Sequence, residues 1–218
     1  MKKVAIIGSP TLHENYQNAL EKVSCKAVIF PDTSCMEKHP DSFDGLLLPG
    51  GGDVCTSLAG YTDPASISPA CYRTPDFPLD LEQLRALNLF YKQKKPVFGI
   101  CKGMQLINLY FHGTIREVSD LPLHQKPQKD VYHPADNLPG SFLHALFGPH
   151  MRINSNHHQC VDTLGKDLYT IQYAPDGETE AISHLSAPII GTQWHPERMP
   201  KTSRQDAILL FQYFISLL

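Results

Sequence analysis

A cysteine between an expected strand and an expected helix is the residue best placed to do chemistry. Cys101 stands in Gly99-Ile-Cys-Lys-Gly103, after the apolar run 96–100 and before a helical pattern over 102–111. This G-x-C-x-G arrangement is the thiol form of the nucleophile elbow, a strained strand-to-helix turn that exposes the nucleophile and needs flanking glycines. The helix N-terminus favours the thiolate, and the backbone N–H of Lys102 can donate to an oxyanion. The alternative is a buried structural cysteine.

A histidine and a glutamate far along the chain supply a candidate base and its partner. A thiol nucleophile needs an imidazole, and the imidazole needs a group that fixes its tautomer. In Gly191-Thr-Gln-Trp-His-Pro-Glu197, Pro196 disfavours helix at His195, so Glu197 can reach the ring from the same extended segment. A zinc deaminase also uses His-x-Glu, but its downstream C-x-x-C is absent. We therefore predict that Cys101 is the nucleophile, that His195 acts first as base and then as acid, and that Glu197 orients the imidazole. The alternative is a His-Pro-Glu sequence that occurs in a loop by chance.

A run of three glycines, Gly50 to Gly52, follows the apolar run 44–49. Backbone N–H groups exposed by such a run can face an anion. A phosphate is one candidate ligand, but neither G-x-G-x-x-G nor G-K-[ST] is present. The other candidate is an oxyanion, with the N–H of Gly51 or Gly52 complementing that of Lys102. Because ligands of open α/β sheets bind at the carboxyl ends of strands, the glycine run and Cys101 are expected to form one site.

The polar segment Asn154-Ser-Asn-His-His-Gln159 carries two adjacent histidines. It is a poor metal site, because neighbouring residues on a strand point apart and no third ligand is evident. The remaining alternatives are a polar surface turn and a recognition loop over the substrate, and no metal is expected. Six other histidines are expected to be structural or exposed: His39, His124, His133, His144, His150 and His184.

Composition excludes several classes of protein. The 218 residues carry a net charge of −3, which argues against a non-specific nucleic-acid binder. No two of the six cysteines form a C-x-x-C pair, so we expect six independent thiols in a reducing cytosol. The apolar N-terminal run is too short for a signal peptide, and no stretch reaches the roughly 18 apolar residues of a membrane span. We expect a soluble cytoplasmic protein.

The elements that must position these residues alternate between strand and helix. Apolar runs predict strands at 3–8, 25–30, 44–49 and 96–100, and helical patterns predict helices at 13–23, 79–94 and 102–111. The second half carries short strands at 150–153, 169–173, 180–184 and 189–194, then a helix at 203–218 capped by Ser203 and Asp206, with long loops at 49–78 and 121–140. This pattern predicts an α/β, flavodoxin-like fold: an open, mostly parallel central sheet with helices on both faces and a small antiparallel β element in the second half. One domain, 1–218, is expected.

Five segments in order resemble the class I glutamine amidotransferase superfamily, and most closely the γ-glutamyl-γ-aminobutyrate hydrolase (peptidase C26) family. They are 44–54, 96–105, 154–159, Ala174-Pro-Asp-Gly177 with Glu180-Ala181, and 191–197. The resemblance implies a triad of Cys101, His195 and Glu197, with oxyanion donors at Gly51 and Gly52. It further implies substrate contacts from the following residues: Gln105, Asn154, Ser155, Asn156, His157, His158 and Asp80.

The sequence also departs from the family pattern. Leu79 stands where Arg is frequent, Lys102 replaces Arg in the elbow, and the usual Asn-Pro after Val54 is missing. These departures bear on the leaving amine rather than on acyl transfer. The resemblance implies a hydrolase that cleaves a small γ-glutamyl amide through a thioester, without a cofactor and with a homodimer as one expected state. The alternatives are a glutaminase subunit that delivers ammonia to a synthetase partner, and a non-catalytic binding or regulatory protein on the same fold.

Overall fold

The computed structural model describes residues 1–59, 74, 76–199 and 207–218, which form a nine-stranded sheet and a separate two-stranded sheet. The strands are β1 (Lys3–Ile7), β2 (Lys26–Phe30), β3 (Gly45–Leu48), β4 (Val97–Ile100), β5 (Ile115–Glu117), β6 (Val131–Asn137), β7 (His150–Ser155), β8 (Gln159–Val161), β9 (Leu168–Tyr173), β10 (Thr179–His184) and β11 (Ile189–Thr192). The α-helices are α1 (Glu14–Glu21), α2 (Ser34–Lys38), α3 (Phe77–Lys92), α4 (Lys102–Tyr110), α5 (Leu121–His124), α6 (Phe142–Phe147) and α7 (Ile208–Leu217). Short 3-10 turns are η1 (Pro40–Ser42), η2 (Thr56–Leu58) and η5 (Pro196–Arg198).

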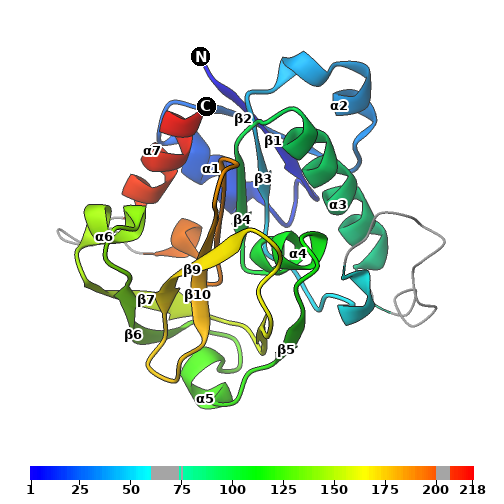
Figure 1. The fold of residues 1–218 in the computed structure, drawn as a ribbon. Helices are drawn as coiled ribbons and strands as arrows, with labels where there is room; N and C mark the ends of the chain where they lie inside the picture. The colour runs from blue at the N-terminus through cyan, green and yellow to red at the C-terminus, as the bar shows by residue number, and fades with distance from the viewer. Residues whose placement is uncertain (60–73, 75, 200–206) are drawn as a thin grey trace.

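One half of the large sheet is parallel and covered by helices on both faces. Its strand order is β2-β1-β3-β4-β11. Alternate residues of β1 point to opposite faces, so Val4 and Ile6 pack with α1 and α7, while Ala5 and Ile7 pack with α3 and α4. Figure 1 shows these two helix pairs on either side of the strands. The predicted α/β class, with a parallel core and helices on both faces, is confirmed.

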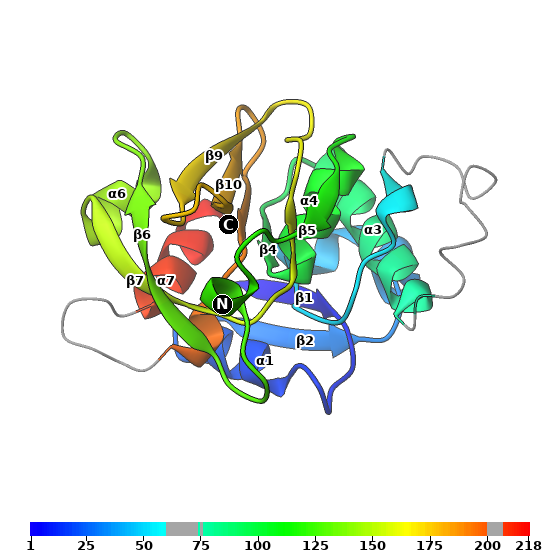
Figure 2. The same cartoon turned by 90° about the horizontal axis from the view of Figure 1, so that it is seen from below.

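The other half of the sheet is antiparallel. From β11 it continues through β10, β9 and β6 to β7, and β5 pairs with β8 in the small second sheet. Figure 2 shows β6 and β7 beside α6, at the end of the molecule away from α3. The antiparallel element expected in the second half is therefore present, both as an extension of the main sheet and as a separate pair.

Some expected boundaries were wrong. The segment 121–140, expected as a long loop, contains α5 and β6. The inward face of β6 is partly polar, with His133 and Asn137 buried beside Ala135, so the apolar alternation that marks a strand is hidden. Strand β7 extends to Ser155 and takes in part of the expected recognition loop. The predicted cap at 203–206 lies outside the described residues.

The cysteines differ from the expectation of six independent thiols. Cys55 is disulfide-bonded, whereas Cys25, Cys35, Cys101 and Cys160 are free. The prediction was therefore wrong for Cys55, and the cysteine pattern no longer argues for a reducing compartment. Cys71 lies outside the described residues.

Among the helices that the structure describes, none has both the length and the apolar character needed to cross a bilayer.

Three neighbouring parallel strands end where the candidate site residues begin. β3 leads into the glycine run, β4 leads into Cys101, and β11 leads towards His195. Because β3, β4 and β11 are adjacent and parallel, their carboxyl ends meet at one edge of the sheet. The topology thus joins segments that are about 50 and 90 residues apart in sequence, which is the usual way an open α/β sheet assembles a site.

Candidate active site

Cys101 occupies a strained turn between β4 and α4. Its backbone has φ 52° and ψ −107°, a conformation that costs energy in a residue with a Cβ atom. The flanking glycines are required by close packing. A Cβ atom at Gly103 would lie 2.2 Å from the carbonyl oxygen of Leu48, and one at Gly99 would lie 2.6 Å from the carbonyl of Gly103. The G-x-C-x-G pattern therefore has a steric origin: α4 packs directly against β3 and β4 only if both positions lack side chains.

His195 lies beside Cys101 and pairs with Glu197 on its other side. The Nδ1 atom of His195 is 2.9 Å from Oε1 of Glu197, whose side chain is fully buried in η5. Burial alone lowers the pKa of His195, but the Cys101 sulfur and the Glu197 carboxylate outweigh it and raise the pKa to about 9. An imidazole in this environment holds a proton firmly, and because Glu197 pairs with Nδ1, the other ring nitrogen is left to face Cys101.

The glycine run is held by two side chains that sequence reasoning missed. The Gly50 N–H donates to the hydroxyl of Tyr16 at 2.9 Å, and the Gly52 N–H donates to Oδ2 of Asp76 at 2.9 Å. Because the Gly52 N–H is already bonded, this structure does not support it as an oxyanion donor. Among the described residues, no acceptor faces the Gly51 N–H. The N–H of Lys102 belongs to the first turn of α4, where no intrahelical acceptor exists.

The side chain of Lys102 lies beneath this loop in an ion-pair network. Its Nζ is 3.0 Å from Oδ2 of Asp76 and 2.5 Å from Oδ1 of Asp80, and Lys102 and Asp80 are almost completely buried. Burial raises the pKa of Asp80 to about 6 although Lys102 opposes the rise. Burial also acts to raise the pKa of Asp76, but its bonds to Lys102 and Gly52 outweigh it and lower that pKa. The expectation that Asp80 contacts substrate was therefore wrong, because its carboxylate faces Lys102 inside the protein.

Cys101 lies between two chambers. One, of about 500 Å³, is lined by Tyr16, Asp76, His195 and Arg198 among others. The second, of about 250 Å³, is lined by Gln105, His157, His158 and Gln159 among others. Gly51, Gly52, Cys101 and Asn156 line both. Cys101 can thus be reached from two sides, and His195 lines only the larger chamber.

Two glutamines connect Cys101 to the floor of the smaller chamber. Gln193 was missed by sequence reasoning, and its Nε2 lies 3.5 Å from Sγ of Cys101. The Nε2 atom of Gln105 donates to Oε1 of Gln193 at 3.2 Å and to the carbonyl oxygen of Gln159 at 2.8 Å. Gln105 therefore lies on the chamber wall, and its amide is oriented by protein groups.

The predicted recognition segment divides into two parts. Asn156, His157 and His158 line the chambers. Asn154 and Ser155 are fully buried in β7 and do not line them. The Oδ1 atom of Asn154 accepts from the backbone N–H of His195 at 3.3 Å, so Asn154 holds the segment that carries His195.

Comparison with known proteins identifies the family. The sequence profile of the Peptidase C26 family matches residues 1–197. The chain belongs to the Peptidase C26 family. It is therefore a C–N hydrolase of the group that includes γ-glutamyl hydrolases and amidotransferase-like proteins.

Individual relatives span nearly the whole chain. A Schizosaccharomyces pombe protein named "Putative glutamine amidotransferase PB2B2.05" is 30% identical over 217 residues, covering 96% of this chain and 83% of its own. The γ-glutamyl-γ-aminobutyrate hydrolase PuuD of Escherichia coli is 27% identical over 234 residues, covering 94% and 85%. A solved structure described as a "putative gmp synthase subunit a protein" of Thermoplasma acidophilum aligns with a TM-score of 0.68 at 19% identity, covering 100% and 94%. This structural likeness confirms the glutamine amidotransferase type of fold.

Proposed function

We propose that this enzyme hydrolyses the amide bond of a small γ-glutamyl compound through a γ-glutamyl thioester on Cys101. The observation that carries the proposal is the position of Cys101, on a strained turn beside the His195–Glu197 pair and between two chambers. The relationship to PuuD supports the choice of a γ-glutamyl substrate.

The proposed reaction uses side chains of this chain and water. The Cys101 sulfur attacks the γ-carbonyl carbon, and the carbonyl oxygen takes the negative charge between the N–H groups of Gly51 and Lys102. The C–N bond then breaks as His195 gives its proton to the leaving amine. A water molecule that loses a proton to His195 attacks the thioester carbon, releasing glutamate and restoring the thiolate–imidazolium pair.

The two chambers suggest how the substrate is oriented. Because His195 must reach the leaving nitrogen and lines only the larger chamber, the amine is assigned to the chamber of about 500 Å³. The glutamyl group then occupies the chamber of about 250 Å³, beside Gln105, Asn156, His157 and His158. The amine chamber contains both Arg198 and Asp76, so it can take amines that carry a carboxylate or a second ammonium.

The experiment is a substrate panel with purified protein. γ-Glutamyl amides whose amines carry a carboxylate, an ammonium or no charge are compared with glutamine, and Cys101→Ala is the control. We expect turnover of at least one γ-glutamyl amide well above that of glutamine, and none in Cys101→Ala. Equal activity of wild type and Cys101→Ala would contradict the mechanism.

A second candidate is a glutaminase subunit that passes ammonia to a synthetase. It is supported by the amidotransferase name of the S. pombe relative and by the amidotransferase-type fold. The same panel separates the two, because a subunit of this kind turns over glutamine slowly alone and faster with its partner. Size-exclusion chromatography with light scattering tests the expected homodimer.

A further inference from the structure

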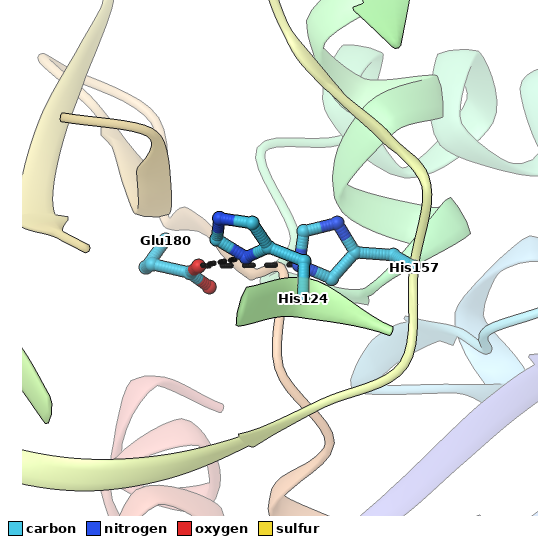
Figure 3. Close-up of side chains that lie close together, drawn as sticks. All are labelled: His124, His157 and Glu180. Carbon is cyan, nitrogen blue, oxygen red and sulfur yellow. Dashed lines mark ion pairs between the residues drawn. The ribbon is translucent and has the colours of Figure 1, made fainter. Parts of the chain in front are cut away.

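Three buried histidines and one glutamate form a second cluster, behind the smaller chamber. His124 lies at the end of α5, His133 on β6, His157 in the turn between β7 and β8, and Glu180 on β10. All are at most 5% exposed. Figure 3 shows the rings of His124 and His157 and the carboxylate of Glu180 directed towards one point. The sequence suggested no third ligand for His157, because the other members come from distant segments.

The ligand atoms lie close together. His124 Nδ1 is 3.3 Å from Oε1 of Glu180, and His157 Nε2 is 3.9 Å from the same oxygen. The three ligand atoms lie within 4.8 Å of one another. In a tetrahedral zinc site with bonds of about 2.0 Å, ligand atoms are about 3.3 Å apart. His124 Nδ1 and Glu180 Oε1 already have that spacing, and the other two separations are at most 4.8 Å.

The histidines are oriented as metal ligands are. On the outer side, Nε2 of His124 is 2.8 Å from Oδ2 of Asp176, and Nδ1 of His157 is 3.1 Å from the carbonyl oxygen of Gln159. An outer N–H that donates to a carboxylate or carbonyl fixes the tautomer and leaves the inner nitrogen free to coordinate. Both histidines therefore present an inner nitrogen to Glu180.

The inner atoms are left without hydrogen-bond partners. Among the described residues, His124 Nδ1, His157 Nε2 and both carboxylate oxygens of Glu180 are buried and have no partner of hydrogen-bond geometry. Such groups are costly to bury, and they converge here. The pairing of β10 with β9 changes register around Glu180 and Ala181, an irregularity that redirects side chains next to sites.

We propose that His124, His157 and Glu180 bind a divalent transition-metal ion of the zinc type. Two imidazoles and one carboxylate are a donor set typical of zinc, whereas magnesium and calcium prefer oxygen ligands alone. The fourth position is taken by water or by Nε2 of His133, which lies 3.6 Å from Oε1 of Glu180. The ion ties α5, the 156–158 segment and β10 together, so it holds the wall of the smaller chamber and does not touch the reacting atoms.

The test is metal binding to chelator-treated full-length protein. Cys101 is first alkylated with iodoacetamide, so that the Cys101–His195 pair cannot bind the ion. We expect one equivalent of Zn²⁺ by calorimetry, and a rise in Tm of roughly 5–10 °C at a free concentration about 100 times the Kd. Co²⁺ in its place is expected to give a tetrahedral spectrum without a thiolate-to-metal band. No binding at micromolar Zn²⁺, or an octahedral Co²⁺ spectrum, would overturn the proposal.

Matched variants locate the site. Glu180→Gln and His124→Gln are expected to weaken Zn²⁺ binding at least about 100-fold. The controls Glu178→Gln, just before β10, and His184→Gln, at its end, also change buried residues and are expected to bind as wild type. If a ligand variant fails to fold by circular dichroism, Asp176→Asn replaces it, with an expected loss of about 10–100-fold. Unchanged affinity in the folded ligand variants, or in Asp176→Asn where it is used, would show that the ion binds elsewhere.

Discussion

Replacing Lys102 by methionine tests whether the buried ion pair beneath the glycine run controls stability. The substitution keeps an unbranched side chain up to Cε and removes the ammonium that faces Asp80. Among the residues that the structure describes, Asp80 then has no cation in contact, and its partner carboxylate Asp76 remains about one-third exposed. A buried carboxylate without a cation either stays charged at high cost or takes up a proton.

The magnitude follows from the pKa of Asp80, which burial raises to about 6 from 3.8 in spite of Lys102. A raised carboxyl pKa favours the folded state at low pH, and that contribution is lost as pH rises through the folded pKa. At pH 8 Asp80 is ionised beside Lys102 in the wild type, whereas in Lys102→Met it has to stay protonated. Because pH 8 is about two units above the folded pKa, the free energy of unfolding of Lys102→Met should be about 3 kcal/mol below that of the wild type, at about 1.4 kcal/mol per unit. At pH 5, Asp80 is mostly protonated in both proteins, so the expected difference is below about 1 kcal/mol.

Urea unfolding of wild type, Lys102→Met, Asp80→Asn and the double variant at pH 5 and pH 8 measures these values. The double variant replaces the carboxylate with an amide, so we expect it to recover most of the loss at pH 8. A Lys102→Met loss that is equal at the two pH values, or that Asp80→Asn does not relieve, would refute the reasoning. Unchanged m-values are required for the comparison, since they show that the extent of unfolding is the same.

Three further predictions concern the site. Iodoacetamide should alkylate Cys101 before the other free thiols, and peptide mapping reports the order. One of those thiols, Cys25, has a pKa raised to about 11 by burial. The preference for Cys101 at neutral pH should be lost in His195→Ala. Glu197→Gln removes a charge that stabilises the imidazolium, so the pKa of His195 should fall from about 9. The value of kcat/KM should drop about 10³-fold or more. A pH–rate profile identical to that of the wild type would argue against the pairing of His195 with Glu197. Gly103→Ala should lower the free energy of unfolding by about 3 kcal/mol, because the new Cβ would lie 2.2 Å from the carbonyl oxygen of Leu48. A thermal unfolding curve equal to that of the wild type would show that α4 can move to make room.

Much of the fold could be predicted because its strands and helices carry local signals. The parallel strands are continuous apolar runs, as expected for strands buried on both faces, and α3 and α4 show helical spacing. β6 was missed because buried polar groups replace part of its apolar face. Asp76 and Tyr16 were missed because nothing in their neighbourhood indicates that they hold the glycine run. Their role depends on contacts across 24 and 34 residues.

The sequence by itself determined the local chemistry of the site. The elbow at Cys101 and the His195–Glu197 pair are encoded in a few consecutive residues, where glycine, proline and side-chain alternation restrict the backbone directly. Only the tertiary structure decided which N–H groups of the glycine run are already bonded, that Asp80 pairs with Lys102, and that His124 and Glu180 meet His157. These depend on which distant strands are neighbours in the sheet and on which side chains are buried together, and no local pattern records either.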